Sequence, residues 1–113
     1  MNFNYKTFEI GINTIISEIQ HDIQIMKYKM NIPEERIKVS IPKFFLTIME
    51  MYLEKIYFQE FEIKLKKTLF GAEIVEGYNN QICVFDEMAT FDSDKLKPIT
   101  LIRNSENELK IER

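Results

Sequence analysis

Four carboxylates lie within nine residues, at Asp86, Glu87, Asp92 and Asp94. Paired carboxylates could act as a general acid and a general base, or they could hold a divalent cation. The segment around Asp92 lacks the glycine and the further oxygen ligands of a calcium-binding loop. A solvated acidic loop is the simpler interpretation, so we expect no metal site and no cofactor.

The single histidine, His21, and the single cysteine, Cys83, are the other candidates for chemistry. A structural zinc site needs about four ligands of the Cys, His or carboxylate type, and this chain cannot supply Cys and His in that number. Cys83 could be a nucleophile only if His21 reached it, but it lies in an apolar run that predicts a buried strand. We therefore predict no catalytic residue and expect that the protein is not an enzyme.

The stretch from residue 68 to residue 94 contains six Asp or Glu residues and no Lys or Arg. Such a negative surface could steer the protein toward a basic partner, or it could serve solubility alone. Tyr78, between two predicted strands, would add an exposed aromatic contact. The predicted partner-binding residues are Glu73, Glu76, Tyr78, Asp86, Glu87, Asp92 and Asp94.

The composition limits the class of protein. The chain has 113 residues, enough for one domain, and 45% of them are hydrophobic. A net charge of −3 argues against binding of duplex nucleic acid. One cysteine and the absence of a secretion signal predict a cytoplasmic protein. No apolar run approaches the roughly 18 residues that span a membrane, so we expect no membrane association.

Apolar spacing predicts a long amphipathic helix over residues 7–30. Ile12, Ile19 and Met26 form one seven-residue column of this helix, and a second column runs four positions along. Alternating polar and apolar residues then predict a strand over residues 36–41.

A second helix is predicted over residues 43–58. Eleven of the fifteen residues from 44 to 58 are apolar or aromatic. A helix that is apolar almost all round must be buried on more than one side. It is therefore expected either at the centre of the fold or at an interface with another chain, which would make a homo-oligomer.

The rest of the chain predicts strands. Residues 70–87 read as a hairpin, because the Gly and Asn residues within 77–80 suit a tight turn. Residues 99–112 form a second, C-terminal hairpin, and residues 59–68 are compatible with helix or strand. The prediction is a single α+β domain, 1–113, with two helices on a mostly antiparallel sheet of four to five strands in the order α-β-α-β-β-β-β.

Two segments of the chain carry a resemblance to known proteins. They are residues 37–43, which lead into a predicted helix, and residues 69–75, which lead into a predicted short hairpin. Over roughly residues 36–87 the chain resembles small uncharacterised proteins of phages and prophages from low-GC Gram-positive bacteria. The resemblance assigns no residue a role. It implies a mobile-element setting, in which small proteins without enzymatic motifs are commonly virion parts or inhibitors of host machinery.

Two functions are therefore expected. The first is a non-enzymatic protein–protein interaction module that inhibits a host or defence protein through its acidic surface, with a partner that presents a basic or nucleic-acid-binding surface. The alternative is a small virion or assembly subunit that self-associates through its apolar helices.

Overall fold

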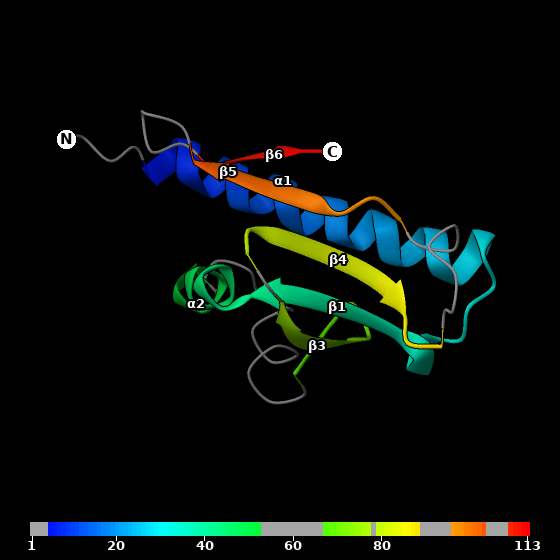
Figure 1. Cartoon of the computed structure of the whole chain (residues 1–113). Helices are drawn as coiled ribbons and strands as arrows, with labels where there is room; N and C mark the ends of the chain where they lie inside the picture. Colours follow the sequence, from blue (N-terminus) through cyan, green and yellow to red (C-terminus); the bar gives the residue numbers. More distant parts are fainter. Residues whose placement is uncertain (1–4, 53–66, 78, 89–95, 104–108) are drawn as a thin grey trace.

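The computed structural model describes residues 5–52, 67–77, 79–88, 96–103 and 109–113. These residues form an α+β fold with two α-helices and a mixed, mostly antiparallel sheet, as the sequence predicts (Figure 1). The described sheet has six strands rather than four to five. The added strand is the two-residue β2 (Thr68–Leu69), at the end of the stretch that the sequence left undecided.

The longest element is α1 (Tyr5–Gln24), which continues as one π-helical turn over Ile25–Lys29. Asn31 ends it with a left-handed φ of 56°, and the Ile32 N–H donates to the Met26 carbonyl over 2.9 Å. The predicted helix over 7–30 is thus present, and its predicted columns face inward. The buried residues of this segment are Ile12, Ile15, Ile16, Ile19, Asp22, Ile23 and Met26.

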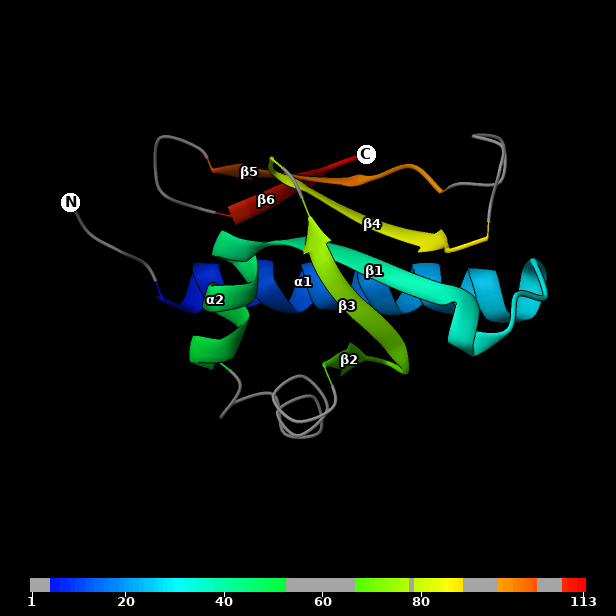
Figure 2. The same ribbon diagram turned by 60° about the horizontal axis from the view of Figure 1, so that its bottom comes forward.

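The short 3-10 turn Glu34–Arg36 leads into β1 (Ile37–Pro42), which lies in the middle of the sheet. It pairs in parallel with β3 (Ala72–Gly77) and antiparallel with β4 (Gln81–Asp86). The predicted hairpin over 70–87 is therefore wrong: both strands exist, but β1 lies between them (Figure 2).

β3 ends at Gly77 on one side of β1, and β4 begins at Gln81 on the other side. Gly77 stands beside Pro42 in the register, and a Cβ at Gly77 would lie 3.0 Å from the backbone C and N atoms of Ile41. Glycine thus permits a close backbone approach here. The predicted strand also began too early, because Phe70 and Gly71 form a turn with φ values of 52° and 84°.

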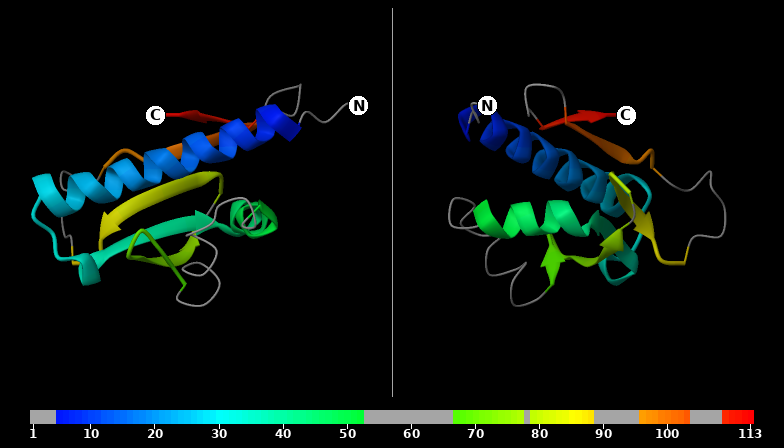
Figure 3. Two further views of the ribbon diagram at one scale, coloured as in Figure 1. Left: turned by 180° about the vertical axis from the view of Figure 1, so that it is seen from behind. Right: turned by 60° about the vertical axis from the view of Figure 1, so that its left-hand side comes forward.

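The C-terminal hairpin is confirmed, with β5 (Ile99–Arg103) antiparallel to β6 (Leu109–Glu112). β5 joins β4 through two paired positions, and β6 contacts α1. Viewed from behind, α1 lies in front of β5 and runs alongside β4 (Figure 3, left). The full strand order is β2-β3-β1-β4-β5-β6.

One face of the sheet carries the hydrophobic core, because alternate residues of each strand point toward the helices. The apolar residues of α1 complete this core. The strand residues that belong to this core are Ile37, Val39, Ile41, Leu69, Ala72, Ile82, Val84, Ile99 and Leu101.

The second helix, α2 (Lys43–Tyr52), begins directly after Pro42. It buries Phe45 and Met49, whereas Phe44 is 44% exposed. The described part of α2 is therefore not buried on all sides, and α1 supplies more of the core. Residues 53–58 of the predicted helix lie outside the described residues. Neither described helix is long and apolar enough to cross a membrane.

Candidate functional site

Asp86, at the end of β4, forms a bidentate ion pair with Arg36, the last residue of the 3-10 turn before β1. The Arg36 Nε and Nη2 atoms donate to its two carboxylate oxygens over 3.1 and 2.6 Å, and the Met88 backbone N–H donates over 2.9 Å. The Asp86 side chain is 8% exposed. The Arg36 hydrogen bonds hold the pKa of this carboxyl below its usual range. Asp86 thus has a structural role: its ion pair ties the end of β4 to the turn before β1, and it is not part of a solvated loop.

Glu73 and Glu87 flank Lys38, a residue of β1. The Lys38 Nζ atom lies 2.6 Å from a Glu73 oxygen and 3.5 Å from a Glu87 oxygen. The hydrogen bond to Glu73 raises the pKa of Lys38. These two carboxylates are exposed, but their charge is partly balanced by the lysine between them.

Of the other predicted contact residues, one is described by the structure and three are not. Glu76 is exposed on β3, whereas Tyr78, Asp92 and Asp94 lie outside the described residues. In the described part of the chain, Arg36 and Lys38 therefore pair with three of the four predicted carboxylates. These two cations offset only part of the charge of the three carboxylates, so the predicted acidic surface is weakened there, and among the described residues Glu76 is its one carboxylate without an ion pair.

Cys83 and His21 are not brought together. Cys83 is a half-buried residue of β4 whose neighbours in sequence, Ile82 and Val84, point to the core, so Cys83 points to the opposite face. His21 is exposed on α1, which packs on the core face. The described residues also contain no group of three side chains able to hold a metal ion.

An ionic cluster that the sequence analysis missed joins α1 to the end of the chain. Arg113 donates to both carboxylate oxygens of Asp22, over 3.0 and 2.7 Å, and to Glu18 over 2.9 Å. It also donates to the carbonyl of Lys97 over 2.7 Å. Asp22 is only 2% exposed, and all of the partners above lie within the protein. We assign it to stability.

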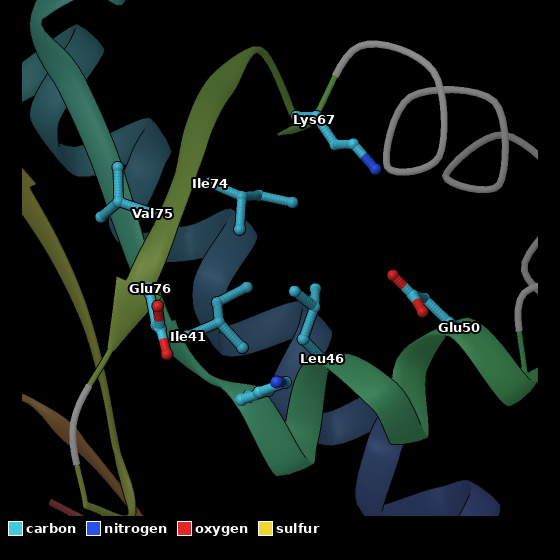
Figure 4. Close-up of a pocket in the computed structure, with 8 residues that line it drawn as sticks. Ile41, Leu46, Glu50, Lys67, Ile74, Val75 and Glu76 are labelled. Carbon is cyan, nitrogen blue, oxygen red and sulfur yellow. The ribbon is translucent and has the colours of Figure 1, made fainter.

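A pocket of about 340 Å³ lies between β3 and α2 (Figure 4). Its apolar wall is formed by Ile41, Leu46 and Ile74, which come from β1, α2 and β3. Pro42 helps to position Ile41 and Leu46, because it ends β1 and α2 begins at the next residue. The remaining lining residues are Val75 and four charged residues, Lys43, Glu50, Lys67 and Glu76.

The four charged residues surround the apolar wall and balance one another in sign. None of them forms an ion pair within the described part of the chain. Among the described residues that line the pocket there is no serine, cysteine or histidine, the side chains that most often form a nucleophile and its base. Its arrangement suits binding by apolar contact with polar groups that fix orientation.

The pocket lies beside a strand edge. The two-residue β2 pairs only with Glu73 and Ala72 of β3, and the Ile74 N–H donates to the Lys67 carbonyl over 2.9 Å. No strand of the described residues pairs with β3 beyond Ile74 on that side. Sequence reasoning could not find this site, because its residues come from four separate parts of the chain.

Comparisons of the chain with protein-family models, with curated proteins and with solved structures found no match.

Proposed function

We propose that this protein is a non-enzymatic protein-binding module, and that the pocket between β3 and α2 is its contact surface. One observation carries the proposal: an apolar wall is surrounded by four charged residues, and it lies next to a length of β3. Within the described residues these four form no ion pair, and no strand pairs with that length of β3 on its outer side. Partner surfaces commonly combine an apolar centre with a polar rim.

The acidic residues near the other end of β3 support a contact surface less well. Lys38 and Arg36 pair with Glu73, Glu87 and Asp86, so a basic partner would have to displace these cations. Glu76 is the one predicted contact residue of the described chain that also lines the pocket. We therefore place Glu76, with Glu50, on the polar rim of the proposed surface.

A mobile-element origin and the inhibition of a host or defence protein inside the cell remain our proposals for the biological role. They rest on the resemblance of residues 36–87 to small phage and prophage proteins. The partner would then be a host protein. Glu50 and Glu76 would attract basic groups on it, and Lys43 and Lys67 would attract acidic groups beside them.

The proposal is tested with immobilised protein and a lysate of a low-GC Gram-positive host. Leu46→Glu places a charge in the apolar wall of the pocket and should remove the captured partner. Ile102→Glu is the matched control, because Ile102 is also half-buried but lies on β5. Circular dichroism checks that both variants fold. Equal capture by the wild type and Leu46→Glu would refute the pocket as the contact surface.

Self-association is a second candidate function, and Phe44 is the observation that favours it. This residue in the first turn of α2 is 44% exposed, and a large exposed aromatic is a common interface residue. Light scattering on a sizing column across a range of concentrations tests it. An assembly that Phe44→Ser dissociates would support a structural subunit, whereas a monomer at every concentration would exclude one.

A further inference from the structure

We propose that the pocket receives an extended segment of a partner protein, which adds to the sheet as a short strand beside Glu76 of β3. This inference rests on the proposed function and specifies the form of the partner. Strand addition to an open sheet edge is a recurring mode of recognition, in which backbone hydrogen bonds hold the segment and a side-chain pocket selects it.

The direction of the backbone groups in β3 is fixed by one hydrogen bond. The Ile74 N–H points away from β1, because it donates to the Lys67 carbonyl. Backbone groups of successive strand residues point to opposite sides, so those of Val75 face β1 and those of Glu76 face outward. Pro42 agrees with this assignment: the opposite one would require a donor from Pro42, which has no N–H.

The outward groups of Glu76 have no partner strand in the described part of the chain. The ladder between β2 and β3 stops at Lys67, whose φ of 56° is not an extended conformation. Glu76 therefore offers one donor and one acceptor at the edge of the sheet, directly beside the pocket that its side chain lines.

The pocket specifies the side chain that the added strand would insert. A residue placed opposite Glu76 points to the same face as the Glu76 side chain, toward Ile41 and Leu46. A volume of about 340 Å³ accommodates one large aliphatic side chain such as leucine or methionine. Because Lys43 and Lys67 balance Glu50 and Glu76, the segment should carry charges of both signs near this residue.

The probe is a displayed library of short linear peptides, selected on the folded wild-type chain. Selected peptides should share a large aliphatic residue with charged neighbours, and Leu46→Glu should abolish their binding. A selected peptide is then synthesised with a methyl group on one backbone nitrogen at a time. Methylation should weaken binding by about tenfold at alternate residues only, because only those N–H groups would face β3. On binding, the Glu76 amide should exchange with solvent at least about tenfold more slowly.

A pair of variants separates the backbone of Glu76 from its side chain. Glu76→Pro removes the outward N–H and should abolish binding, whereas Glu76→Gln keeps the N–H and should retain most of it. Peptides that require Leu46 but tolerate methylation at every nitrogen would overturn strand addition and leave the protein-binding function intact. A slowly exchanging Glu76 amide in the free protein, at any concentration, would overturn strand addition by showing that the edge is already covered. A library that yields no Leu46-dependent peptide would overturn both proposals.

Discussion

Removal of the Arg113 side chain should destabilise the protein more than any other change at its surface ionic groups. Arg113→Ala leaves the Asp22 carboxylate, which is 2% exposed, without its two hydrogen bonds from the guanidinium. A buried charge that loses its partner costs about 3–5 kcal/mol. Because the Arg113 side chain is itself 26% exposed and water reaches the pair, we expect the lower end, about 3 kcal/mol.

This loss is a large part of the roughly 5–15 kcal/mol by which domains are usually stable. Urea unfolding followed by circular dichroism measures it directly. With a slope of about 1–3 kcal/mol per molar urea, the midpoint should fall by roughly 1–3 M while the slope stays unchanged.

Two control variants make the reasoning refutable. Glu18→Gln removes the more exposed partner of Arg113 and should cost at most about 1 kcal/mol. Asp22→Asn added to Arg113→Ala removes the stranded charge and should restore part of the lost stability. If Arg113→Ala costs no more than Glu18→Gln, or if Asp22→Asn restores nothing, the buried charge does not explain the effect.

Three further predictions concern the central strands. Arg36 lowers the pKa of Asp86 in the folded protein. The ion pair therefore contributes fully to folding stability above the unfolded pKa of about 3.9, and this contribution is lost as the pH falls through the lower folded pKa. At pH values below about 4, the urea midpoint of the wild type should decrease, and that of Asp86→Asn should decrease less. Gly77→Ala forces a Cβ to within 3.0 Å of neighbouring backbone and should cost roughly 1–3 kcal/mol in thermal unfolding; an unchanged midpoint would contradict the close approach. Val75→Pro should prevent folding because its N–H faces the sheet, whereas Glu76→Pro should leave the circular dichroism spectrum native; equal effects would contradict the assigned directions.

Patterns between nearby residues predicted the two described helices and five of the six described strands, but not the two-residue β2. Ile12, Ile19 and Met26 recur at the helical period, and all three are buried on one face of α1. Such patterns could not predict that β1 lies between β3 and β4. Gly77 and the residues after it are compatible with a hairpin turn and equally with a connection that passes β1. Which strand fills the space between β3 and β4 depends on contacts between residues far apart in the sequence.

The candidate site shows the same limit, with one exception. Ile41, Leu46, Lys67 and Ile74 form the pocket only after β1 and β3 pair in parallel, so nothing local marks them. Asp86 could have been assigned better, since it continues the alternation of the buried residues Ile82 and Val84 on β4. A carboxylate at a core-facing position predicts a cationic partner.

The central place of β1 has a consequence during synthesis. Lys38 pairs with Glu73 on one side and with Phe85 on the other, so both neighbours of this strand are made long after it. A ribosome adds about 5–20 residues per second, so β1 waits roughly 2–10 s for its second neighbour. Until β3 has been made, this apolar segment has neither of its sheet neighbours, and α1, already made, is the element available to shield it.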